Sequence, residues 1–260
     1  MKKIIMTMFT IFSVLTLSIN LAEARNVKFA QVTDVHFKNN SYALNKIVRD
    51  INKNKEIDFV VFTGDNIGSA KPVNLKKFIK DASELEKPFY VVLGAKDVSK
   101  HRGLGKKQYM KIVRSENKFH PSESNYVFKK KGVIFIAVDG SKEYVPSDNG
   151  FYNKETLDWL DAQLTKYRKG KVVIFQHYPL ANRVGDEFNY TYNAIEYLQM
   201  LSKHNNVIAV ITGHYHKNDE IIYNGVKHIT TPAASDGFYK IIDIDCDNDY
   251  EVYTVIKEVQ

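Results

Sequence analysis

Cysteine is nearly absent from this sequence, in which Cys246 is the only one. A single cysteine excludes an internal disulfide, so the fold does not depend on an oxidising compartment. Cys246 lies among acidic residues in the segment IIDIDCDND, where we expect a structural thiol. The chain also lacks proline- or glycine-rich linkers, internal repeats and low-complexity runs. With 44% hydrophobic and 12% aromatic residues, it is long enough to form a single domain around a sizeable core.

The N-terminus has the features of a secretion signal. Lys2 and Lys3 precede an apolar stretch that ends in Ala22-Glu23-Ala24, a small-x-small cleavage pattern. Polar residues interrupt the stretch and no stop-transfer charges follow it, which argues against a retained membrane anchor. A lipid anchor would need a cysteine at the cleavage site. We therefore predict a signal peptide at residues 1–24 and a single domain at residues 25–260, exported to the periplasm or secreted and free of the membrane.

The charge balance is basic but not patterned for nucleic acid. Signal cleavage removes two of the 37 basic and one of the 30 acidic residues, so the formal charge falls from +7 to +6. Such an excess favours anionic partners in general. The lysines are scattered, with short clusters at residues 100–107 and 129–131, and no contiguous basic stripe carries aromatic residues for base stacking. A nuclease is therefore the weakest of the functional interpretations, and we expect no nucleic-acid partner.

Short hydrophobic runs alternate with longer amphipathic segments from Val27 onward. Residues 27–34, 58–65 and 88–95 read as buried parallel strands, separated by expected helices at 41–54 and 73–86. The alternation continues with strands at 132–139, 171–179 and 207–216, and helices at 153–167 and 193–204. Adjacent strands follow at 219–230, 239–245 and 251–259, the first folded at a Tyr-Asn-Gly hairpin turn. This order predicts an α/β fold with two sheets packed face to face and helices outside.

Histidines and aspartates follow these strands where each one ends. Asp34 and His36 lie at the end of the first expected strand, and Asp65 lies at the end of the second. His177 lies at the end of the strand at 171–179, and His214 and His216 lie at the end of the strand at 207–216. Residues two apart project to the same side if the extended conformation persists.

Imidazole and carboxylate are ligands that zinc, iron and manganese accept, and the set exceeds the needs of one ion. The ordered combination predicts a dinuclear metal centre of the kind that assists displacement at phosphorus. The four remaining histidines lack this context, and we expect structural or surface roles for them: His101, His120, His204 and His228.

Taken together, these motifs resemble the calcineurin-like metallophosphoesterase superfamily, whose five motif blocks occur in order from Asp34 to His216. The resemblance implies a four-layer αββα sandwich of two mixed β-sheets flanked by helices. It also implies that Asp34, His36 and His216 bind the first ion and that Asp65 bridges both. His177 and His214 would bind the second ion.

The third motif block departs from the family pattern. The family has Gly-Asn-His followed by an acid, in which the asparagine binds the second ion and the histidine contacts phosphate and protonates the leaving group. Here the block is Gly94-Ala95-Lys96-Asp97. Ala95 removes one ligand, which weakens the second metal site. A further difference, Gly68 in the segment GDNIG, disfavours the ferric tyrosinate site of purple acid phosphatases and leaves manganese, zinc or ferrous iron as candidate ions.

Lys96 has two competing interpretations. In the first, Lys96 is a phosphate clamp or substitute acid held by Asp97, its high pKa lowered by burial and nearby cations. In the second, Lys96 points into solvent and Asp97 caps the following helix.

The predicted function is accordingly a metal-dependent phosphoesterase that hydrolyses a small phosphomonoester or phosphodiester by attack of a metal-bound hydroxide. The alternative is a catalytically impaired relative that binds metal and phosphate. The retained ligand set favours the enzyme, and the substitutions at residues 95 and 96 favour the alternative. The sequence does not choose between monoester and diester, or indicate an oligomeric state.

Overall fold

The most hydrophobic segments of the chain form the strands of two sheets, as seen in a computed structural model that describes residues 26–38, 42–145, 147–185 and 189–259. The predicted signal peptide lies outside these residues. The first sheet has the strand order β11-β10-β1-β2-β3. Its strands are β1 (Asn26–Val32), β2 (Phe59–Thr63), β3 (Phe89–Val92), β10 (Phe238–Asp245) and β11 (Glu251–Glu258). Strands β1, β2 and β3 are parallel, and the two C-terminal strands join antiparallel at the side of β1.

The second sheet is also mixed, with the order β4-β5-β6-β7-β9-β8. Its strands are β4 (Tyr126–Lys130), β5 (Val133–Ala137), β6 (Val172–Phe175), β7 (Val207–Thr212), β8 (Asp219–Tyr223) and β9 (Val226–Thr230). The four central strands are parallel, and each edge strand is antiparallel to its neighbour. The predicted hairpin turn joins β8 to β9, and Asn224 and Gly225 there have φ angles of 50° and 77°, as a type I′ turn requires.

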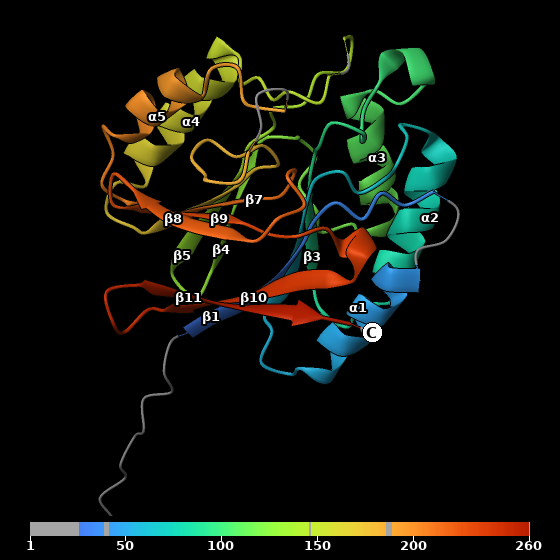
Figure 1. Cartoon of the computed structure of the whole chain (residues 1–260), viewed down its shortest axis with the longest axis horizontal. Helices are drawn as coiled ribbons and strands as arrows, with labels where there is room; N and C mark the ends of the chain where they lie inside the picture. The colour runs from blue at the N-terminus through green and yellow to red at the C-terminus, as the bar shows by residue number, and fades with distance from the viewer. Residues whose placement is uncertain (1–25, 39–41, 146, 186–188, 260) are drawn as a thin grey trace, which may run out of the picture.

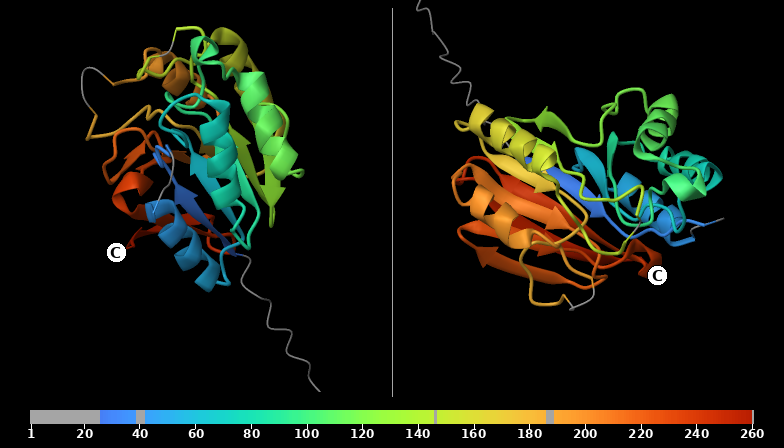
Figure 2. Two further views of the ribbon diagram at one scale, coloured as in Figure 1. Left: turned by 90° about the vertical axis from the view of Figure 1, so that its right-hand side faces the viewer. Right: turned by 90° about the horizontal axis from the view of Figure 1, so that it is seen from above.

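Helices cover the outer face of each sheet (Figures 1 and 2). The first sheet is covered by α1 (Tyr42–Lys53), α2 (Pro72–Ala82) and α3 (Lys106–Glu116), and the second by α4 (Lys154–Lys166) and α5 (Ala194–Leu201). Two short 3-10 helices, η1 (Lys100–Arg102) and η2 (Ala234–Asp236), lie in connections. The predicted four-layer αββα sandwich is confirmed.

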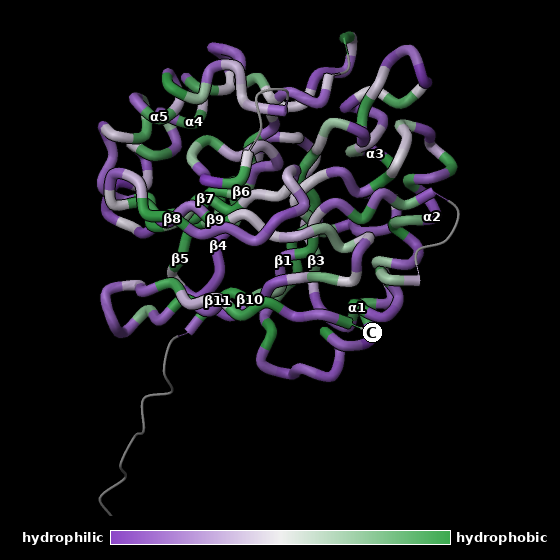
Figure 3. The backbone as a smooth tube through the Cα atoms, in the orientation of Figure 1, coloured by the Kyte–Doolittle hydropathy of each residue, from purple (hydrophilic) through white to green (hydrophobic). Residues whose placement is uncertain are grey.

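Three hydrophobic layers hold this arrangement together. One lies between each sheet and its helices, and the third lies between the two sheets. The middle layer is rich in phenylalanine: the ring centroids of Phe29 and Phe59 are 4.8 Å apart, and those of Phe135 and Phe175 are 5.5 Å apart. Figure 3 shows the hydrophobic colour gathered along the strands. Since aromatic side chains each bury a large area, this layer fixes the two sheets against one another and so aligns their edges.

Helix α3 and strand β4 were not predicted from the sequence. Helix α3 begins at the end of the basic cluster at residues 100–107, and only Tyr109, Met110 and Val113 of its residues are buried. Strand β4 is a short edge strand with lysines at its end. Over the described residues, no helix is long and hydrophobic enough to cross a membrane.

Candidate metal centre

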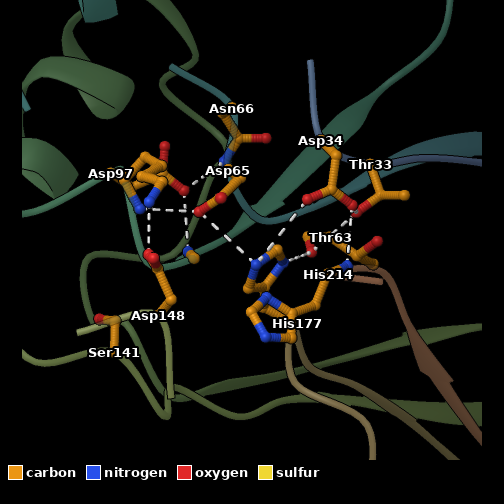
Figure 4. Close-up of polar contacts among 12 residues, drawn as sticks. Thr33, Asp34, Thr63, Asp65, Asn66, Asp97, Ser141, Asp148, His177 and His214 are labelled. Atoms are coloured by element: carbon orange, nitrogen blue, oxygen red, sulfur yellow. Dashed lines mark hydrogen bonds and ion pairs between the residues drawn. The ribbon is translucent and has the colours of Figure 1, made fainter. Parts of the chain in front are cut away.

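The carboxyl ends of the parallel strands in both sheets meet at one edge of the sandwich, and this edge carries the predicted ligands. Asp34 and His36 follow β1, and Asp65 follows β2, all from the first sheet. His177 follows β6 in the second sheet, and His214 and His216 follow β7. Figure 4 shows the His177 ring between the Asp34 and Asp65 carboxylates, with the His214 ring beside it. The strand-end pattern in the sequence therefore brings residues from the two sheets together as predicted.

The backbone at these residues is not extended. Asp34, His36, Asp65, His214 and His216 have φ angles of 53°, 48°, 49°, 74° and 55°, all in the left-handed region. The expectation that Asp34 and His36 share one side of an extended strand is wrong, because β1 ends at Val32 and the chain then turns. Non-glycine residues adopt this conformation uncommonly, although aspartate and histidine do so more readily than most, and such residues are enriched at functional sites.

Three glycines allow the strand ends to approach one another closely. A Cβ atom at Gly94 would lie 2.2 Å from the Asp65 nitrogen, and one at Gly213 would lie 2.5 Å from Oδ2 of Asp34. At Gly64 it would lie 2.5 Å from Nδ1 of His177. Since real Cβ contacts are much longer, each glycine is required by the position of a predicted ligand.

The first group of converging donor atoms belongs to Asp34, His36 and His216. Oδ1 of Asp34 lies 3.8 Å from Nε2 of His36 and 3.3 Å from Nε2 of His216. The two Nε2 atoms are 3.1 Å apart. A carboxylate oxygen and two imidazole nitrogens facing one position match the ligand preference of zinc, manganese and ferrous iron.

The second group consists of Asp34, Asp65 and His177. Nε2 of His177 lies 3.5 Å from Oδ1 of Asp65 and 3.9 Å from Oδ1 of Asp34. The other Asp65 oxygen, Oδ2, lies 4.0 Å from Nδ1 of His36. Both carboxylates thus lie between the two groups. His214 is outside this compact set, although its ring centroid is 5.0 Å from that of His177.

Hydrogen bonds to the backbone orient these side chains and leave their inner atoms without partners. Nδ1 of His177 donates to the Thr63 carbonyl at 2.9 Å, and the His214 ring bonds the backbone of Asn189. Oδ2 of Asp34 accepts from Thr33 Oγ1 and the His214 nitrogen. Nε2 of both histidines and Oδ1 of Asp34 are buried and have no hydrogen-bond partner in the described part of the chain. Buried orphan atoms of this kind, with backbone-oriented imidazoles, fit a metal centre.

The carboxylates and imidazoles shift one another's pKa values in opposite directions. Burial opposes ionisation of Asp34, but His177, His216 and His36 around it hold the pKa of its carboxyl below the usual range. Burial, followed by the Asp34 charge, raises the pKa of Asp65 to about 6. Burial lowers the pKa of His177, so this imidazole is neutral and able to donate a lone pair. The pKa of His216 is instead raised, chiefly by its hydrogen bond to Asp34. Asp34 and His177 therefore present an anionic and a neutral donor near pH 7.

The Gly94-Ala95-Lys96-Asp97 turn lies against Asp65. The Lys96 backbone nitrogen donates to Oδ1 of Asp65 at 2.7 Å. The Lys96 ammonium forms an ion pair with Asp148, which lies in the loop after β5, and not with Asp97. Asp97 is fully buried and accepts hydrogen bonds from the backbone nitrogens of Gly94 and Ile67.

Neither interpretation of this turn made from the sequence is therefore correct in its details. Asp97 does not hold the ammonium, because its oxygens are used by backbone donors. It does not cap a helix either, since residue 99 precedes η1. Burial, followed by the Asp65 charge, raises the pKa of Asp97 well above its usual range. Asp97 positions the turn from inside the protein, and Lys96 is left 37% exposed beside the ligand cluster.

The remaining histidines lie away from the cluster, as expected. His120 is buried, accepts from the Val91 nitrogen and contacts the Pro121 carbonyl. His204 pairs with Asp161 at 2.7 Å, His228 is buried in β9, and His101 lies in η1 on the surface.

Three residues near the cluster were missed in the sequence. Asp148 pairs with Lys96 from 52 residues away. Asn66 donates to the Val92 carbonyl and to Asp97, and so joins the end of β2 to the turn after β3. Tyr178 packs against the rings of both His177 and His214. Only Asn66 and Tyr178 had a sequence signal, their position next to a predicted ligand.

Comparison with known proteins assigns the chain to a family. The model for calcineurin-like phosphoesterases matches residues 27–218, most of the described chain. The chain belongs to the calcineurin-like phosphoesterase family. Members of this family are metal-dependent phosphoesterases, so the predicted family and enzyme class are confirmed.

Two of the curated relatives that match this chain are named as phosphodiesterases. A probable glycerophosphodiester phosphodiesterase, GpdQ of Arcobacter nitrofigilis, is 28% identical over 232 residues, covering 82% of this chain and 80% of that protein. The 3′,5′-cyclic adenosine monophosphate phosphodiesterase CpdA of Haemophilus influenzae is 24% identical over 226 residues, covering 82% and 78%.

Solved structures share the fold. A dimetal phosphatase from Danio rerio superposes with a TM-score of 0.66 at 15% identity, over 90% of this chain and 99% of that one. GAP50, described as the anchor in the inner membrane complex of Plasmodium, has a TM-score of 0.65 at 19% identity, over 90% and 89%.

Proposed function

We propose that this protein is an exported phosphoesterase that hydrolyses a small phosphodiester or phosphomonoester with the help of two divalent ions. The observation that carries the proposal is the cluster of buried, unpartnered donor atoms of Asp34, His177 and His214, completed by Asp65, His36 and His216. The names of the curated relatives favour a diester.

The residues fit a pair of manganese, zinc or ferrous ions. Asp34, His36 and His216 would hold the first, and His177 and His214 the second, with Asp65 between them. Bound ions of this kind lower the pKa of a water molecule and neutralise the charge that develops on phosphoryl oxygens. The protein itself orients the imidazoles through backbone carbonyls and keeps His177 neutral by burial.

Lys96 is the group we assign to the substrate phosphate. Its backbone is fixed on Asp65, and its side chain is half-exposed at the mouth of the cluster. Its charge is felt at His177, where it helps to lower the pKa. An ammonium is a good electrostatic partner for phosphate. Asp148 would hold Lys96 until a phosphate replaces it, since an exposed ion pair is worth only about 0–1 kcal/mol.

A second candidate is a metal- and phosphate-binding protein without turnover. The observation that favours it is Ala95, whose side chain lies in a hydrophobic cluster and offers the metal no donor. GAP50, a structural relative described as an anchor, has the same fold.

Metal-dependent turnover separates the two candidates. The mature protein, prepared metal-free, is titrated with manganese, zinc or ferrous iron and assayed with bis(p-nitrophenyl) phosphate and p-nitrophenyl phosphate. We expect turnover that requires metal and is abolished by His36→Ala and by Asp65→Ala, whereas His204→Ala, remote from the cluster, retains it. Binding of metal with no turnover of either compound would favour the second candidate.

A further inference from the structure

Three polar atoms without partners lie in neighbouring rings beside the second donor group. They are Nε2 of His177, Nε2 of His214 and the hydroxyl oxygen of Tyr178, and each is buried with no hydrogen bond to the residues that the structure describes. The Tyr178 ring centroid is 4.9 Å from that of His177 and 5.0 Å from that of His214. Leaving one buried polar group unsatisfied costs about 1–3 kcal/mol, so three together indicate a shared partner that the chain does not supply.

Tyr178 also shares its hydrophobic surroundings with the turn after β3. Tyr178 and Ala95 belong to the same buried cluster, which packs against the second sheet. Burial, followed by the Asp65 carboxylate and then more weakly by other acids including Asp97, raises the pKa of Tyr178.

We propose that Tyr178 is a positioning residue of the second metal site, and that its hydroxyl supplies the polar oxygen that Ala95 does not. The proposal rests on the metal pair of the proposed function. In this proposal two adjacent residues after β6 contribute to one site: His177 provides an imidazole nitrogen and Tyr178 provides a hydroxyl oxygen.

Tyr197 provides a matched control. It is also fully buried, lies in the same hydrophobic cluster and has a hydroxyl without a partner among the described residues. Its ring contacts Tyr152, with centroids 4.9 Å apart, and burial alone raises the pKa of its hydroxyl. Removing this hydroxyl therefore tests the cost of a buried phenol without touching the metal ligands.

The first experiment is calorimetric titration of the metal-free protein with Mn²⁺ and with Zn²⁺, together with metal analysis after dialysis. We expect two ions per wild-type chain. Tyr178→Phe should weaken the second binding event at least ten-fold and leave the first unchanged, whereas Tyr197→Phe should change neither. Equal affinity for the second ion in wild type and Tyr178→Phe would overturn the inference. Failure of the wild type to bind two ions would instead overturn the metal pair on which it rests.

A compensation experiment excludes a purely structural effect of the lost hydroxyl. Ala95→Asn introduces a new oxygen donor into the buried cluster that contains Tyr178. We expect Ala95→Asn to restore second-site affinity in the Tyr178→Phe background and to give little gain in the wild type, where the hydroxyl already occupies this position. Equal gains in the two backgrounds would mean that the two side chains act independently, and would contradict the proposal.

Discussion

The backbone nitrogen of Lys96 donates a hydrogen bond to Oδ1 of Asp65 over 2.7 Å. The turn that lacks the usual asparagine and histidine is therefore still joined to the central carboxylate of the site. Residue 96 contributes only its backbone nitrogen to this contact, so the contact does not depend on the side chain at position 96. The divergence from the family pattern is confined to side chains and leaves the framework of the site in place.

Replacement of Lys96 tests its assigned contact with phosphate. Lys96→Ala should lower kcat/KM about 10- to 100-fold, which corresponds to about 1.4–2.7 kcal/mol of lost transition-state stabilisation. Asp148→Asn should retain activity or lower KM, because the ammonium is then free for the substrate. Lys100→Ala, a nearby lysine paired loosely with Glu143 at 4.0 Å, serves as control. Unchanged steady-state kinetics in Lys96→Ala would show that Lys96 is a surface residue that does not contact the substrate.

A double substitution at the same turn tests whether Ala95 and Lys96 reduce catalytic activity. Ala95→Asn with Lys96→His recreates the family motif. If the native lysine has taken over a role, the double variant gains little activity over the wild type, and this is the result we expect. An increase of ten-fold or more in kcat would mean that the turn had impaired the enzyme.

Gly94 is expected to tolerate no side chain. A Cβ atom there would meet Asp65 at 2.2 Å, and such overpacking costs about 1–3 kcal/mol while displacing the carboxylate. Gly94→Ala should therefore lose both stability in urea unfolding and metal affinity. Gly132→Ala is the control, because its φ of 88° costs about 1–2 kcal/mol in a turn remote from the site. The control should lose stability alone, and a parallel loss of metal binding in both variants would refute the local explanation.

Asp97 should matter for the geometry of the turn and not for proton transfer. Asp97→Asn places amide hydrogens against the backbone donors of Gly94 or Ile67, and leaving one buried donor unsatisfied costs about 1–3 kcal/mol. We expect lower stability and weaker metal binding, with an unshifted pH profile for whatever activity remains. A displaced pH profile at wild-type stability would instead identify Asp97 as an acid in the reaction.

His120 should make the stability of the metal-free protein depend on pH. Burial lowers the pKa of His120 to about 4 from an ordinary value of 6.5. The folded state therefore favours the neutral ring, so its contribution is complete above pH 6.5 and is lost as the pH falls toward 4. His120→Gln should show a smaller drop in unfolding free energy between pH 7 and pH 5 than the wild type. Parallel curves for the two proteins would contradict this assignment.

The layers, and the edge at which the proposed ligands lie together, could be predicted from the sequence because both follow from local patterns. Continuous hydrophobic runs identify buried strands, and polar residues at their ends identify the edge where a site forms. Helix α3 was not predicted because its three buried residues, which lie among lysines, give only a weak helical periodicity of hydrophobic residues. The ion pair between Lys96 and Asp148 depends on how two distant loops pack, and the left-handed turns after β1 and β2 depend on hydrogen bonds from other strands. Neither the ion pair nor the left-handed turns can be recognised from the residues adjacent to them in the sequence.

The left-handed backbone at five of the proposed ligands sets the geometry of the site against the stability of the fold. Each such residue carries a conformational cost of about 1–2 kcal/mol that glycine would not carry. Glycine at Asp34 or Asp65 would in turn leave the donors of Thr33, His214 or Lys96 without their acceptors. Ala95 and Lys96, which depart from the family motif, have no left-handed backbone. The conformational cost of the site therefore falls on the residues whose side chains converge, and the divergent turn adds nothing to it.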